Sequence, residues 1–115
     1  MAYFEDLEVW QEAKTLTISI YQLMKDNRDY GFRDQIQRAS VSIMNNIAEG
    51  SESGSNATNV RFLQIAKGSC AEVRSMLYLA YELDYCTNET KEQLIASTKK
   101  ITAFINRLIE YNNSH

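Results

Sequence analysis

Apolar residues recur with a helical period in four separate segments of this chain, and no segment shows the strict alternation that is typical of a half-buried strand. The segments cover residues 5–26, 32–49, 55–84 and 88–112. In the first and the last of them, the apolar side chains follow one another at intervals of 4, 3, 4 and 3 residues. Each segment is therefore predicted to be an amphipathic helix with one apolar face.

Short polar breaks separate the four predicted helices, at residues 26–31, 50–56 and 84–88. Connections this short make consecutive helices antiparallel neighbours, and four amphipathic helices can bury their apolar faces only against one another. The sequence therefore predicts an all-α fold, an up-down-up-down antiparallel four-helix bundle, with residues 1–115 forming a single domain.

Cap and glycine positions refine the predicted ends. Ser55 and Thr87 precede the third and fourth helices, where hydroxyl side chains are favoured as N-caps. Gly50 follows the second helix and is expected to end it in the left-handed conformation. Gly68 lies inside the third helix, where glycine costs about 1 kcal/mol relative to alanine. With Ser69 it predicts a patch of small residues that another helix can approach closely.

Composition and charge exclude several classes of protein. The 115 residues include no proline, and 12 Lys and Arg against 15 Asp and Glu give a formal charge of −3. Collagen, disordered chains, disulfide scaffolds and dedicated cationic nucleic-acid modules do not fit this composition. Cys70 and Cys86 form no CxxC motif and read as reduced thiols. No signal peptide or membrane span is evident, so we expect a cytoplasmic protein without membrane contact.

The residues needed for common catalytic and metal sites are missing from the sequence. The only histidine, His115, is the last residue, so neither a Ser-His nor a Cys-His nucleophile is expected. There is no Glu-x-x-His pair for a metal site in a bundle and no glycine-rich dinucleotide motif. Lys67-Gly68-Ser69 lacks the upstream glycine of a phosphate-binding loop. We therefore expect no enzyme activity, no metal and no cofactor.

Several helices carry more apolar residues than one face requires. Such extra rows either broaden the core or face another subunit, and the tyrosines among them favour self-association because a half-exposed ring suits an interface. The surplus residues are Met44, Ala48, Leu77, Tyr78, Tyr81, Phe104 and Tyr111.

Four short motifs occur in a fixed order along the chain. They are Asp-Leu-x-Val-Trp at 6–10, Gln-x-x-Arg-Ala at 35–39, Asn-Ile-Ala-Glu-Gly at 46–50 and Ala-x-Gly-Ser at 66–69. Together they closely resemble the bacterial four-helix bundle family that is encoded by intervening sequences of 23S ribosomal RNA genes. The motif residues that we single out are Trp10, Arg38, Asn46, Glu49, Gly50, Gly68 and Ser69.

The resemblance implies an up-down-up-down bundle that assembles into a ring-like homopentamer and has no established catalytic activity. A distantly similar set of proteins serves as accessory factors of reverse transcriptases in diversity-generating retroelements, where a basic surface contacts nucleic acid. This chain departs from the family pattern at Met44, where a proline is usual, and at Ser51-Glu52-Ser53, which lacks the usual basic residue. The second helix is therefore expected to be straighter, and the nucleic-acid inference is weaker for this member.

Two motif residues invite specific interpretations. Glu49 falls in the last turn of the second helix, where the helix dipole disfavours a carboxylate, so Arg38 or Arg61 is expected to compensate it. That pair would close the turn as a structural salt bridge, or mark a polar site at a subunit interface or for a ligand. Asn46 is expected to cap backbone groups of the following loop.

Two readings of function remain open. The leading one is a non-catalytic scaffold or adaptor that forms a cyclic homo-oligomer. The alternative is an accessory protein that binds RNA or DNA through basic residues spaced seven apart on single helix faces, although ordinary solvated faces look the same. The residues of this alternative are Lys67 with Arg74 and Lys100 with Arg107, joined by Arg33 and Arg38.

Overall fold

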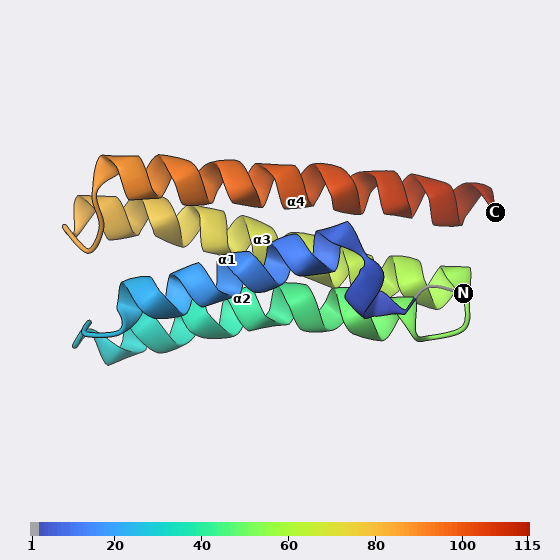
Figure 1. Cartoon of the computed structure of the whole chain (residues 1–115), viewed down its shortest axis with the longest axis horizontal. Helices are drawn as coiled ribbons and strands as arrows, with labels where there is room; N and C mark the ends of the chain where they lie inside the picture. Colours follow the sequence, from blue (N-terminus) through green and yellow to red (C-terminus); the bar gives the residue numbers. More distant parts are fainter. Residues whose placement is uncertain (1–2) are drawn as a thin grey trace.

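The computed structural model describes residues 3–115 and contains four long helices and one short 3-10 helix (Figure 1). Within that range there is no strand. The elements in chain order are η1 (Phe4–Asp6), α1 (Glu8–Met24), α2 (Tyr30–Ser51), α3 (Asn56–Glu82) and α4 (Asn88–Ser114). The predicted all-α four-helix bundle is confirmed.

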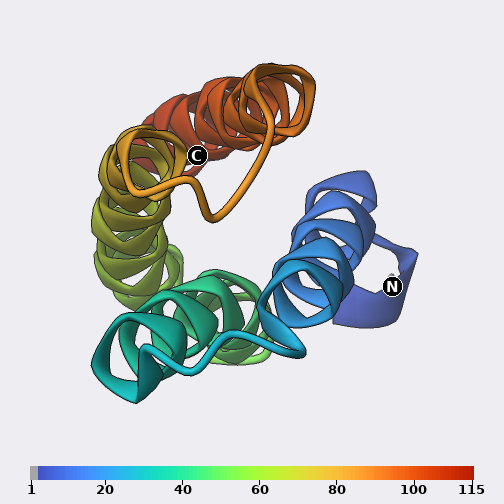
Figure 2. The same cartoon turned by 90° about the vertical axis from the view of Figure 1, so that its left-hand side faces the viewer.

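The helices run alternately up and down around one common axis, in a bundle of 45 × 20 × 20 Å. Seen from the end, consecutive helices are neighbours, and α4 comes back beside α1 (Figure 2). This leaves α1 diagonal to α3 and α2 diagonal to α4, with no Cα atoms within 8 Å of each other across either diagonal in residues 3–115. The seam between α1 and α4 is the most open of the four (Figure 2).

A single apolar core fills the space between the helices. Burying one large aliphatic side chain contributes about 1.5–3 kcal/mol, so the buried aliphatic side chains supply most of the stabilisation. Those that are at most 1% exposed include Leu16, Ile20, Ile36, Ile43, Ile47, Leu63, Leu77, Ile101 and Ile105.

No helix in residues 3–115 is both long enough and apolar enough to cross a membrane.

The helix starts follow their caps. The Ser55 hydroxyl accepts the amide of Thr58, and the Thr87 hydroxyl accepts the amide of Thr90, each at 3.1 Å, which confirms both predicted N-caps. The first helix was predicted to start at residue 5, but Leu7 has an extended backbone and separates η1 from α1.

Two positions with positive φ shape the turns. Gly54 has φ 80° in the turn between α2 and α3. Asp84 has φ 61° after α3, where the amide of Tyr85 donates to the carbonyl of Ala80 at 2.8 Å. This six-to-one hydrogen bond around a left-handed residue is the Schellman arrangement that ends many helices. It sets the position of Tyr85.

Tyr85 joins the two loops at one end of the bundle. Its hydroxyl donates to Asp29 Oδ2 at 2.7 Å, and its ring meets Phe32 edge-on with centroids 5.3 Å apart. The other oxygen of Asp29 accepts the amide of Phe32 at 3.2 Å and so caps α2. The hydrogen bond from Tyr85, followed by that from the Phe32 amide, lowers the pKa of Asp29, and the same bond to Asp29 raises the pKa of Tyr85.

Replacing Tyr85 by Phe is expected to destabilise the protein in a pH-dependent way. The variant keeps the ring contact with Phe32 and loses only the hydroxyl. Because folding lowers the pKa of Asp29, the stabilisation is present above the ordinary carboxyl pKa and is lost as pH falls through the folded value. Thermal unfolding of wild type and Y85F should therefore differ at pH 7 and converge in acid. Tyr111→Phe, whose hydroxyl makes no hydrogen bond in residues 3–115, is the control, and an equal Tm loss in both variants would contradict the assignment.

Candidate functional site

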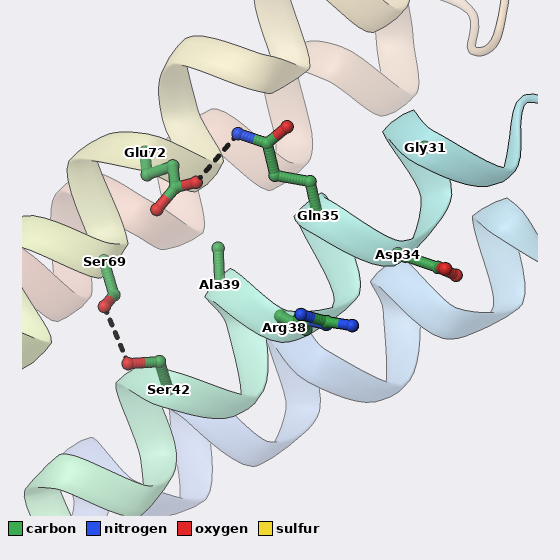
Figure 3. A pocket seen from close by; sticks show the side chains of 8 residues that line it. All are labelled: Gly31, Asp34, Gln35, Arg38, Ala39, Ser42, Ser69 and Glu72. Carbon is green, nitrogen blue, oxygen red and sulfur yellow. Dashed lines mark hydrogen bonds between the residues drawn. The ribbon is translucent and has the colours of Figure 1, made fainter.

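A polar groove between α2 and α3 brings several motif residues together (Figure 3). Its volume is about 460 Å³. Because positions three or four apart share a helix face, α2 contributes a continuous row of side chains and α3 adds two more. The lining residues are Gly31, Asp34, Gln35, Arg38, Ala39, Ser42, Ser69 and Glu72.

Hydrogen bonds cross the groove at two levels. Gln35 Nε2 donates to Glu72 Oε2 at 3.2 Å, and the hydroxyls of Ser42 and Ser69 lie 2.8 Å apart (Figure 3). Asn46 extends the second level, since its Nδ2 donates to the Ser42 carbonyl at 2.8 Å and to the Ser42 hydroxyl at 3.0 Å. Asn46 thus binds back into α2 and does not cap the following loop, so that prediction is wrong.

Arg38 lies on the rim of the groove. Its side chain extends away from Glu72, in the same direction as Asp34 (Figure 3). Arg38 is exposed, and no carboxylate oxygen of residues 3–115 lies within 4 Å of its guanidinium. The groove therefore presents an uncompensated guanidinium beside two exposed carboxylates, which suits a polar partner better than an apolar ligand.

The expected ion pair of Glu49 with Arg38 or Arg61 does not form within residues 3–115. Glu49 and Arg38 are eleven residues apart on α2, which is about 16 Å along a helix axis. Arg61 instead lines a separate surface cavity with Thr58, Phe62 and Ile65. Glu49 is exposed, so water solvates its carboxylate.

Gly50 makes the close helix contact that the sequence predicted at Gly68, whereas the space beside Gly68 is open within the described chain. Gly50 does not end α2, which continues to Ser51; it is buried where α3 crosses closely. A Cβ at Gly50 would lie 2.9 Å from Phe62 Cβ and 3.2 Å from the Asn59 carbonyl oxygen. At Gly68, by contrast, no heavy atom of residues 3–115 beyond its own stretch of helix backbone would lie within 4 Å of a Cβ.

Trp10 anchors the start of the chain. The edge of its half-buried ring meets Phe4 of η1 with centroids 5.1 Å apart, and the Lys14 ammonium lies 5.2 Å from the ring centre. Trp10 therefore packs η1 against α1 and is remote in sequence and position from the groove residues.

The basic residues that the sequence selected do not share one face. Lys67 and Arg74 flank Cys70, whose Sγ donates to the Thr98 carbonyl at 3.2 Å, so both lie along the α3–α4 seam. Lys100 lies on the other flank of α4, where its ammonium meets Glu12 of α1 at 2.9 Å.

The remaining basic residues have aromatic neighbours. The Arg107 Cζ lies 4.6 Å from the centre of the Phe104 ring, and the Arg33 Cζ lies 4.8 Å from the centre of the Tyr30 ring. Such a contact uses one face of each guanidinium and leaves its edges for other partners. Lys100 differs from both, because its hydrogen bond to Glu12 raises its pKa and partly compensates its charge.

The two cysteines are free thiols, Cys70 buried and Cys86 half-buried. Within residues 3–115, no group of three or more His, Cys, Asp or Glu side chains could hold a metal ion. Burial raises the pKa of both Cys70 and Cys86, which disfavours the reactive thiolate.

Comparisons with known proteins agree with the motifs. A family model described as 23S rRNA-intervening sequence protein matches residues 5–107. The solved structure of a protein of unknown function from the S23 ribosomal protein family of Bacteroides thetaiotaomicron superposes with a TM-score of 0.82, at 24% identity, over 88% of this chain and 97% of that one. No curated protein matches the chain significantly.

The opposite environments of the two glycines yield a matched prediction. Gly50→Ala should destabilise the protein by about 1–3 kcal/mol because the added methyl overlaps Phe62 and the Asn59 backbone. Gly68→Ala should stabilise an isolated subunit by about 1 kcal/mol because alanine favours the helix and meets nothing. Urea denaturation of both variants measures the two changes. Equal effects of the two substitutions would contradict the close approach of α3 at Gly50.

Proposed function

Since this chain belongs to the family of 23S rRNA-intervening sequence proteins, we propose that it acts as a cytoplasmic, non-catalytic scaffold or adaptor built from a cyclic homo-oligomer. The proposed ring is a pentamer, which is the number that the family resemblance implies. The two observations below support the assembly.

Apolar side chains on the outer face of α3 carry the proposal. Ile65 and Leu79 are 52% and 49% exposed, and Leu83, directly after the helix, is 43% exposed. Because they are 14 and 4 residues apart, the three lie on one side of α3. Gly68, one turn from Ile65, leaves room for a close neighbour on the same side. The exposed carboxylate of Glu72 lies on the same side of α3, seven residues from both Ile65 and Leu79. Exposed apolar side chains beside a helical glycine, with a polar group among them, suit a surface that packs against another helix.

A second apolar patch lies on the diagonal helix. Ile18 and Tyr21 of α1 are 50% and 45% exposed. Since α1 and α3 are diagonal, their outer faces point to different sides of the bundle (Figure 2). Contact between two unlike patches on successive copies is head-to-tail, which is the interface type that closes a ring.

Light scattering coupled to size exclusion tests the proposal with a charged substitution. We expect the wild type to elute as a pentamer of about 66 kDa, five times the subunit mass of 13.2 kDa. Ile65→Asp should reduce this to a monomer that keeps its helical circular dichroism, because a half-exposed side chain contributes little to the fold of the subunit.

The matched control is Gln93→Asp, which adds the same charge at an exposed position of α4. It should remain assembled. A monomeric wild type at micromolar concentration, or an assembled Ile65→Asp variant, would overturn the proposal.

The second candidate is the nucleic-acid-binding accessory role, which the resemblance of the motifs implies as an alternative. One observation favours it: neither Lys67 nor Arg74 has a carboxylate oxygen within 4 Å in residues 3–115. Their charges on the α3–α4 seam are uncompensated, and a ring would repeat the pair in every subunit.

Salt-dependent RNA binding would identify that role. Lys67→Gln with Arg74→Gln should weaken binding at low salt more than Lys100→Gln with Arg107→Gln, because Glu12 already compensates Lys100. A fluorescence anisotropy titration with a short structured RNA measures both double variants. If the wild type binds no RNA even at low salt, the candidate is excluded and the scaffold is favoured.

A further inference from the structure

A cationic pocket lies at the start of α2, on the loop that follows α1. Its volume is about 250 Å³. Charged or polar side chains form most of its wall. The lining residues are Lys25, Asp26, Asn27, Arg28, Tyr30 and Arg33.

The pocket carries positive charge in a protein that is negative as a whole. Lys25, Arg28 and Arg33 contribute three cations against the single carboxylate of Asp26. Neither Lys25 nor Arg28 has a carboxylate oxygen within 4 Å in residues 3–115. The formal charge of the lining is therefore +2, whereas that of the whole chain is −3.

The two other carboxylates of this region are directed elsewhere. Asp29 accepts hydrogen bonds from the Phe32 amide and the Tyr85 hydroxyl, which hold it as the helix cap. Asp34 lines the α2–α3 groove and forms a long ion pair with Arg33, with its Oδ1 3.8 Å from Nε. Neither carboxylate lines the cationic pocket, and Lys25 and Arg28 keep their charges without a carboxylate partner in residues 3–115.

Arg33 lies against the Tyr30 ring, with its Cζ 4.8 Å from the ring centre. Its Nε is shielded from solvent and has no hydrogen-bond partner in the described chain, but the side chain as a whole is 31% exposed. An incoming anion would therefore meet the exposed part of the guanidinium. The positive end of the α2 dipole lies beside it.

We propose that this pocket binds the phosphoryl group of a small phosphorylated molecule. Three cations around one pocket suit the double negative charge of a phosphate monoester better than a single carboxylate. A planar guanidinium can donate to two phosphate oxygens at once, and the flexible Lys25 can reach a third. The pocket shares no residue with the apolar patches on α1 and α3, so the proposal does not rest on assembly.

Titration by ¹H–¹⁵N NMR in a phosphate-free, low-salt buffer tests the site with three probes. Inorganic phosphate and AMP should each give saturable shifts centred on residues 25–33, and adenosine should give none. Shifts at the same residues with equal affinity indicate that the phosphoryl group alone is bound. Tighter binding of AMP indicates that the nucleoside adds contacts. Both results support the pocket.

Charge-removing variants measure the contribution of each cation. Arg33→Gln and Arg28→Gln should each weaken phosphate binding about tenfold, the effect of losing one charge-assisted hydrogen bond. Arg33→Lys keeps the charge but loses the planar group and should weaken binding about threefold. The matched control Lys99→Gln removes an exposed charge on α4, away from the pocket, and should leave the affinity unchanged.

Three results would overturn the proposal. They are the absence of saturable shifts with phosphate and AMP at millimolar concentration, shifts centred away from residues 25–33, or an equal loss of affinity in Lys99→Gln and Arg33→Gln. Unchanged thermal unfolding of Arg33→Gln separates loss of binding from loss of structure.

Discussion

The mutual burial of four apolar helix faces is the interaction on which the rest of this structure depends. Leu16, Ile43, Leu77 and Ile101 come from four different helices, and each is at most 1% exposed. None of the helices can hide its apolar face alone, so the bundle forms as a unit. Hydrophobic burial has no direction, however, and many relative shifts of the helices would bury similar areas. Other contacts must select the alignment that is observed.

Small polar side chains at three of the seams provide that selection. Between α1 and α2, Thr17 Oγ1 donates to the Ser40 carbonyl at 3.1 Å, and between α2 and α3 the hydroxyls of Ser42 and Ser69 meet. Between α3 and α4, the Cys70 thiol donates to the Thr98 carbonyl. A shift by one turn would break these hydrogen bonds between helices and leave each group only the partners within its own helix. The α1–α4 seam has the exposed Lys100–Glu12 pair instead, and it is the most open seam.

The surface divides into regions of different chemistry. The outer side of α3 exposes Ile65 and Leu79, the groove between α2 and α3 is polar, and the pocket beside the 25–29 loop carries a net positive charge. A net charge of −3 conceals this division, because Asp26 is the one carboxylate among the residues that line the pocket. Local charge and exposure therefore say more about partners than the overall balance does.

The sequence by itself determined the fold class, the number and order of the helices, and the caps Ser55 and Thr87, because hydrophobic period and capping chemistry are local properties. Its motifs also singled out Arg38 and Ser69, two of the eight residues that line the α2–α3 groove, without predicting the groove itself. Only the tertiary structure decided what the glycines and polar residues do. Gly50 turned out to be the close contact and Gly68 the open position, since a glycine's role depends on the distance to a neighbouring helix.

The same reason explains the other differences from the sequence-based predictions. Glu49 has no arginine within reach because the helix places Arg38 three turns away, and Asn46 bonds within its own helix. The cationic pocket combines Lys25 and Arg28 of a loop with Arg33 of a helix, and no motif spacing predicted that they would line one cavity. The path of the turn between α1 and α2 decides which charged side chains come together. Asp29 is kept out of the pocket by its hydrogen bond with Tyr85, 56 residues away, and this contact exists only once the bundle has formed.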